Sequence, residues 1–219
     1  MRNRISMKSL LGSFALLLSL PFGTAQALSV DSGTSTLTDG QICSSATVLG
    51  CLAPLFQLGS AATVSGGTLD ITGSTLSFSF SVASAIFNGS DGPVSAVTLT
   101  DVIYSGSLTV SPNGPDRFEF QDQLSSMSGT ATPTGAGAAS AFSNVAVNTT
   151  GQCIGTPGTS LVCGFLFGPT GSPLTINGNG RFLRQSVNIN AVPEPGTAVL
   201  LGLGLASLAA SRRRASSSL

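Results

Sequence analysis

The sequence predicts an all-β fold, an antiparallel β-sandwich of jelly-roll-like form, placed between an N-terminal signal peptide and a C-terminal transmembrane helix. Three observations support this prediction. Apolar and polar residues alternate with a period of two through the centre of the chain, where no apolar stripe of helical period appears. Pairs of turn-forming residues separate the alternating segments. Only 8% of the residues are charged, so hydroxyl and amide groups supply most of the polarity, as is typical of exported β-rich domains.

The first 27 residues have the three parts of a secretory signal peptide. Three basic residues precede an apolar run at positions 10–20. As a helix this run would reach about 16 Å, far short of the roughly 30 Å core of a bilayer, so we favour a cleaved signal over a retained anchor. Ala25 and Ala27 fit the small-x-small pattern of a signal peptidase site. Cleavage there would give a mature chain that starts at Leu28, outside the cytoplasm.

The segment from residue 28 to residue 190 is expected to fold as one domain of about eight to ten short strands. The clearest strand is "TLSFSFSV", in which Leu76, Phe78, Phe80 and Val82 alternate with hydroxyl-bearing residues. Two further stretches, 97–103 and 183–189, repeat this pattern. Their expected inward-facing residues are Val97, Leu99, Ile103, Leu183, Val187 and Ile189, with Asp101 as an exception on the same face.

Glycine-rich pairs predict where the chain turns between these strands. We interpret Gly66-Gly67 and Asn88-Gly89 as hairpin turns, 112–115 as a further turn and 129–140 as a flexible loop. The segments 88–91 and 113–116 share the pattern Asn-Gly-x-Asp, whose oxygens are ligands that calcium prefers. Because Asn-Gly is also an ordinary hairpin signal, we favour the turn interpretation.

Four cysteines fit a domain that folds outside the cytoplasm. Cys43 and Cys51 flank one short turn-rich segment, and Cys153 and Cys163 flank another. We expect two local disulfides, Cys43–Cys51 and Cys153–Cys163, each worth roughly 2.5–3 kcal/mol on the chain-entropy model. Crossed pairing is the alternative that the spacing leaves open. A metal site is not expected, because histidine and CxxC spacing are both absent.

Charge and side-chain chemistry exclude several classes of function. Acidic residues outnumber basic residues between 28 and 190, so the domain lacks the basic patch that a nucleic-acid partner requires. Without histidine, a Ser-His-Asp or Cys-His arrangement is impossible. The remaining catalytic candidate is a carboxylate pair, Asp116 and Asp122, which would share one face of a strand while Glu119 points away. We expect a protein that is not an enzyme and that has no cofactor.

The tail, residues 191–219, combines an extended motif, an apolar stretch and a basic cluster. The uncharged stretch 196–211 would form a helix of about 24 Å, which is short for a bilayer core of roughly 30 Å. The basic side chains after it can reach lipid headgroups, and they predict that the domain lies outside the cytoplasm. The residues that define the tail are Val192, Pro193, Glu194, Pro195, Arg212, Arg213 and Arg214.

This arrangement resembles the PEP-CTERM sorting signal of exported proteins in Gram-negative bacteria, many of which make extracellular polysaccharide. The resemblance covers the tail only, and "ASSSL" after the arginines departs modestly from the usual pattern. It implies recognition by exosortase, a membrane-embedded, cysteine transpeptidase-like enzyme that would cut near Pro-Glu-Pro and release or re-attach the domain. A plain membrane anchor with a proline-containing linker is the alternative.

The prediction is therefore a chain of three parts: a signal peptide (1–27), a β-rich extracytoplasmic domain (28–190) and a sorting signal with a short transmembrane helix (191–219). The expected partners are signal peptidase, exosortase, the inner membrane as a transient anchor, and extracellular polysaccharide. We expect a non-enzymatic protein of the cell surface or extracellular matrix, associated with biofilm. The alternatives are a carbohydrate-binding module and a hydrolase that uses the carboxylate pair.

Overall fold

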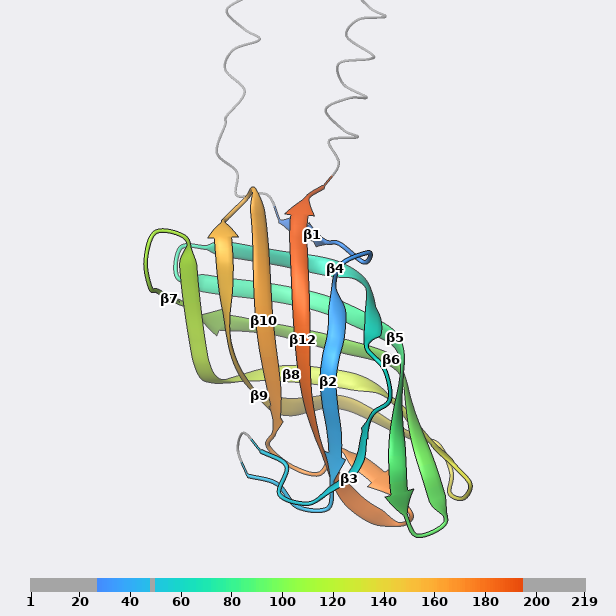
Figure 1. The fold of residues 1–219 in the computed structure, drawn as a ribbon. Coiled ribbons are helices and arrows are strands. Elements are labelled where there is room, and N and C mark those ends of the chain that lie inside the picture. The colour runs from blue at the N-terminus through green and yellow to red at the C-terminus, as the bar shows by residue number, and fades with distance from the viewer. Residues whose placement is uncertain (1–26, 48–49, 195–219) are drawn as a thin grey trace, which may run out of the picture.

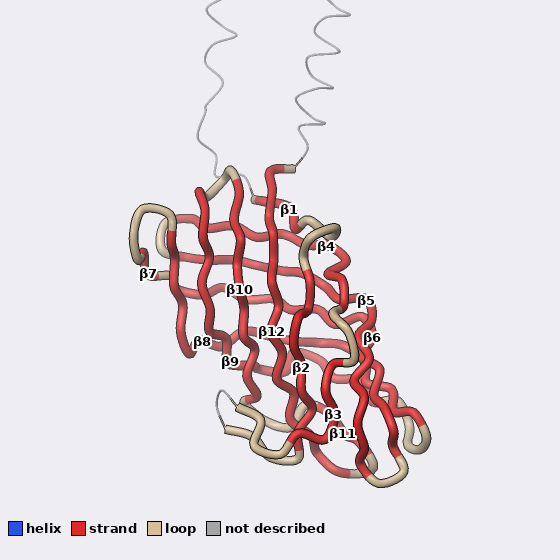
Figure 2. Tube along the Cα trace, viewed as in Figure 1, coloured by secondary structure: helices blue, strands red, loops and turns tan. Residues whose placement is uncertain are grey.

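The computed structural model describes residues 27–47 and 50–194, and nearly all of this chain is β-strand (Figure 2). The strands are β1 (Leu28–Val30), β2 (Thr36–Cys43), β3 (Pro54–Leu58), β4 (Ala62–Thr72), β5 (Thr75–Asp91), β6 (Val94–Thr109), β7 (Ser111–Pro112), β8 (Arg117–Thr134), β9 (Ser140–Thr156), β10 (Ser160–Pro169), β11 (Leu174–Ile176) and β12 (Asn179–Pro193). The all-β prediction is confirmed. No helix in this part of the chain is long and apolar enough to cross a membrane, and the predicted helix at 196–211 lies outside it.

The strands form one continuous antiparallel sheet that returns to its starting strand. Its order is β1-β4-β2-β3-β5-β6-β8-β9-β10-β12-β11, and additional pairings join β1 to β12, β2 to β12 and β4 to β5. Because of these extra pairings, β12 lies beside β10 on one side and beside β1 and β2 on the other. The jelly-roll-like sandwich is not confirmed, since one sheet supplies both layers.

Two layers of strands cross at a steep angle (Figure 1). One layer contains β2, β10 and β12, and the other contains β4, β5 and β6. The long strands β8 and β9 bend and contribute to both layers, because β8 pairs with β6 along one part and its pairing with β9 shifts register between Phe120 and Gln123. Such a bulge adds a residue on one strand and bends that strand. The bend lets the single sheet fold back so that its two layers enclose the core.

Aromatic rings fill the space between the layers. Phe80 of β5 stacks on Tyr104 of β6, with ring centroids 5.1 Å apart, and Tyr104 lies 4.6 Å from Phe167 of β10. Phe78 packs against Phe165 of the opposite layer, with ring centroids 4.9 Å apart. All five rings are nearly or fully buried, so they stabilise the fold through a large loss of apolar surface to water. The alternation predicted for residues 76–82 is confirmed.

One predicted face changes in the middle of β6. Val97 and Leu99 are buried as expected, but Ile103 is 47% exposed, while Val102 and Tyr104 face the core. The cause is a register shift between Thr100 and Ile103 in the pairing with β8, with Asp101 in the left-handed region at φ 52°. The extra residue in this bulge exchanges inward and outward positions for the rest of the strand.

Two predicted turns and the first part of a predicted loop lie inside strands. Gly66 and Gly67 belong to β4, where the pairing with β5 shifts register and both residues have positive φ. Asn88 and Gly89 belong to β5 and pair with β3. Of the predicted loop 129–140, the first part belongs to β8, with Thr130 opposite Ala141. These corrections share one cause: glycine serves here as a bulge or close-approach residue, not as a turn. The turn at 112–115 is confirmed between β7 and β8.

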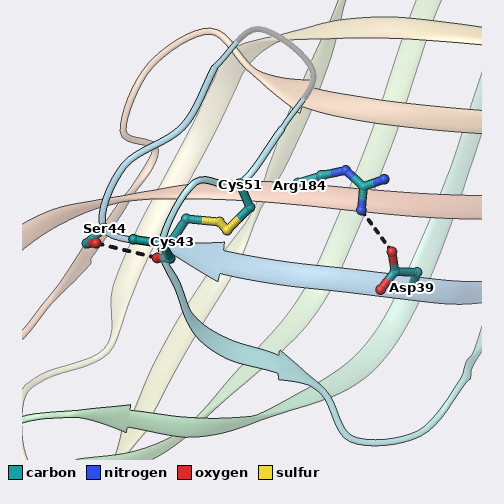
Figure 3. Close-up of a disulfide and its surroundings, with 6 residues drawn as sticks. Asp39, Cys43, Ser44, Cys51 and Arg184 are labelled. Carbon is teal, nitrogen blue, oxygen red and sulfur yellow. Dashed lines mark hydrogen bonds and ion pairs between the residues drawn. A yellow bond between two sulfur atoms is a disulfide. The ribbon is translucent and has the colours of Figure 1, made fainter.

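Both local disulfides are confirmed. Cys153 and Cys163 are direct partners across β9 and β10, with Cα atoms 4.0 Å apart. Cys43, at the end of β2, is joined to Cys51, which closes the loop after that strand (Figure 3). Beside this loop, Asp39 of β2 and Arg184 of β12 form an ion pair at 2.8 Å that also appears in Figure 3.

Candidate functional site

The first and last strands of the described chain meet at one end of the molecule (Figure 1). In the antiparallel pairing of β1 with β12, Leu28 lies opposite Pro193 and Ser29 lies opposite Val192. Leu28 is fully buried, and it also pairs with Leu69 of β4. A three-residue strand is thus inserted between β4 and the end of β12. The predicted start of the mature chain and the start of the predicted sorting motif are direct neighbours.

The predicted sorting residues emerge from this pairing. Val192 is 41% exposed, and Pro193 and Glu194 are exposed. Ser29 Oγ donates a hydrogen bond of 3.3 Å to Glu194 Oε1, so the acidic side chain of the motif contacts β1. β12 also runs past the predicted domain boundary at residue 190, since its last three residues are still paired. The motif therefore begins within the sheet and leaves it as extended backbone.

The structure describes only part of the predicted sites. Ala27 directly precedes β1, whereas Ala25 lies outside the described residues, so the signal peptidase site stays a prediction. Pro195 and the three arginines at 212–214 also lie outside them. Of the sorting residues, Val192, Pro193 and Glu194 can be placed.

Comparison with known families bears on this end of the chain. The family described as PEP-CTERM protein-sorting motif matches residues 191–214. This range starts with Ala191 of β12 and includes the proline-glutamate-proline sequence and the basic cluster.

The chain carries a PEP-CTERM sorting motif. The motif marks an exported protein that exosortase processes during its passage through the membrane. No curated protein and no solved structure matches the chain. The comparisons therefore bear on the motif and not on the β-domain that precedes it.

The predicted carboxylate pair does not lie on a regular strand. Asp116 precedes β8, and Asp122 sits in the bulge of that strand with φ 51°. The Asp122 carboxylate accepts weak hydrogen bonds from Asn148 and Thr150, at 3.3 and 3.4 Å. Glu119 forms an ion pair with Arg117 at 3.0 Å. The regular alternation from which we expected a shared face for the two aspartates is interrupted between them.

The two Asn-Gly-x-Asp segments differ in structure. Asp91 forms an ion pair of 2.6 Å with Arg181, and both side chains are largely buried. In the other segment, the Asn113 amide donates to Glu119 at 2.8 Å. Among the described residues, no three acidic, histidine or cysteine side chains are grouped where they could hold a metal ion.

An open groove of about 610 Å³ runs over the outer face of β8, β9, β10 and β12. In register across these strands lie Glu119, Gln152, Gly164 and Asn188, so a residue without a side chain sits between two amides. A Cβ at Gly164 would meet only Asn188 Oδ1, at an ordinary 3.6 Å. Neither packing nor backbone conformation requires glycine there. Other polar lining residues are Gln121, Thr150 and Ser186.

Sequence reasoning missed β1 and the groove. β1 has only three residues, too few for an alternating pattern, and its partners are distant in sequence. The only signal was the predicted cleavage after Ala27, which places Leu28 first in the mature chain. The groove depends on the register of four strands, and an isolated Gly164 in a strand gives no indication of it.

Proposed function

We propose that this protein is a non-enzymatic component of the cell surface or extracellular matrix, delivered by its sorting motif and associated with polysaccharide in biofilm. The observation that carries the proposal is the PEP-CTERM motif that continues directly from β12 of a disulfide-bonded β-domain. Signal peptidase would release the domain at Ala27, and exosortase would cut near Glu194. Because the sequence lacks histidine, its commonest general base is missing, which supports a structural role.

Export and sorting are tested by following the protein in cells with and without residues 191–219. We expect the full chain to reach the surface or the medium with its tail removed, and the truncated chain to be mislocalised. The intact mass of the mature protein fixes both cleavage points. Equal amounts and equal sizes of the two forms in the surface fraction would contradict the proposal.

A second candidate function is the binding of polysaccharide in the groove over β8, β9, β10 and β12. Its lining is rich in amides and hydroxyls, among them the side chains of Gln121, Ser186 and Asn188. Uncharged donors and acceptors of this kind match sugar hydroxyls. The gap at Gly164 would let a sugar chain approach the backbone closely.

Filling the groove tests this candidate. Gly164→Val adds a β-branched side chain where space exists, so the fold should remain intact while glycan retention falls. Ser77→Val, on an exposed position of β5, is the matched control and should bind as the wild type does. Binding is measured on a glycan array with and without calcium. Retention that Gly164→Val leaves unchanged would rule out the groove, and no retention of the wild type would rule out the function.

A further inference from the structure

The last two residues of β12 depend on one neighbouring strand. β10 pairs with β12 only as far as Ala191, and β2 pairs with it only as far as Asn188. Among the described residues, Val192 and Pro193 therefore have β1 as their sole strand partner. These two residues belong to the matched sorting motif. Their extended conformation is thus supported by a segment at the opposite end of the domain sequence.

β1 is itself firmly held. Leu28 is fully buried and Val30 is 7% exposed, so both side chains belong to the core. The strand pairs with β4 on its other side, and the amide of Asp31 donates to the carbonyl of Asn190 at 2.8 Å. The position of β1 is therefore set by the folded domain. Because the end of β12 pairs with β1, its position is fixed relative to the domain as well.

We propose that β1 is a positioning element for processing by exosortase. By pairing with Ala191–Pro193, it keeps the first part of the motif extended and fixed to the domain before the enzyme arrives. Proteins that bind peptides through their backbone take them in the extended form, and an extended segment ordered in advance loses less entropy on binding. The hydrogen bond from Ser29 to Glu194 also orients the only acidic side chain of the motif.

The proposal makes sorting sensitive to folding. β1 can occupy its place only when Leu28 and Val30 are packed in the core, so a chain with an unfolded domain would present a disordered motif. The proposal rests on processing at the motif and does not depend on what the exported domain binds. Leu28 is also the predicted first residue of the mature chain, so signal-peptide cleavage and sorting would act on adjacent strands.

The first test compares two matched substitutions at opposite ends of β12. Val30→Gly weakens β1, and Ile176→Gly weakens β11, another buried three-residue strand that pairs with the beginning of β12. The processed fraction is measured in cells by intact mass, and disulfide formation together with protease resistance verifies folding. We expect Val30→Gly to lower the rate of processing about tenfold and Ile176→Gly to leave it near that of the wild type.

The second test restores the pairing covalently. Ser29→Cys/Val192→Cys places cysteines at directly opposite positions of β1 and β12, which suits a cross-strand disulfide. We expect this disulfide to restore processing to Val30→Gly. Val162→Cys/Asn190→Cys joins β10 to β12 at another opposite pair and should not restore it.

Three results would overturn the proposal or its basis. Equal processing of the two glycine variants would show that β1 merely stabilises the domain. A disulfide between residues 29 and 192 that blocks processing would show that the pairing of the motif with β1 must break before exosortase can act. A wild-type chain that is never cut would instead refute processing at the motif itself.

Discussion

The buried contact between Tyr104 and Gln185 allows a quantitative test of the core. The Tyr104 hydroxyl donates to Gln185 Oε1, and the two residues are 0% and 1% exposed. Within the described part of the chain Gln185 Nε2 has no hydrogen-bond partner, so this amide is already only half satisfied. Tyr104→Phe removes the donor and leaves a buried amide with neither end bonded. We expect a loss of about 1–3 kcal/mol in the free energy of unfolding.

The assay is denaturant and thermal unfolding of the domain with both disulfides intact. For a domain of this size, that loss corresponds to a fall in Tm of roughly 2–12 °C. The double variant Tyr104→Phe/Gln185→Met replaces both polar groups by apolar ones and should recover most of the loss. A Tyr104→Phe protein as stable as the wild type, or a double variant that loses the sum of the two single effects, would refute the reasoning.

Three further predictions follow from the described contacts. Burial raises the pKa of Tyr104 well above its ordinary value, so above about pH 10 the unfolded chain loses a proton that the folded chain keeps. Stability should then fall as pH rises, less so in Tyr104→Phe, and because Tyr104 is the only tyrosine, tyrosinate absorbance in the native state reports it directly. Cys153→Ser/Cys163→Ser should cost about 2.5–3 kcal/mol in chemical unfolding, and an unchanged midpoint would argue against the chain-entropy estimate. Gly67→Ala should lower the free energy of unfolding by about 2–4 kcal/mol, because the added Cβ would lie 2.1 Å from the Ser79 carbonyl oxygen. Gly73→Ala, which has open space around it, should lower it by about 1 kcal/mol. Similar losses in the two variants would contradict the steric argument.

Sequence patterns predict the strands of this domain wherever alternation continues without interruption. Leu76 to Val82 alternate over a regular stretch, and their burial follows directly. The prediction fails for Ile103, because a bulge is not encoded by hydrophobic periodicity, and the pattern marks Asp101 only as an exception on the expected inward face. It fails again at Gly66-Gly67, since glycines that form a turn and glycines that allow a bulge give the same local signal.

The candidate sites also differ in how far a local sequence pattern predicts them. The sorting motif is a contiguous sequence, so it can be identified without a structure. The contact between Ser29 and Glu194 joins residues 165 positions apart, and no local pattern contains it. The disulfides lie between these cases, because short loops between cysteines favour local pairing, and the register of β9 and β10 places Cys153 opposite Cys163.

The return of the sheet to its first strand limits how copies of the domain can associate. Among the described strands, only β7 and β11 have a single partner, and they contain two and three residues. Every longer strand has a partner on each side over at least part of its length, so none of them presents a full-length unpaired edge from which another copy could extend the sheet into a fibre. At high local concentration outside the cell, association through side chains on the broad faces is therefore favoured over growth of the sheet from a long edge strand.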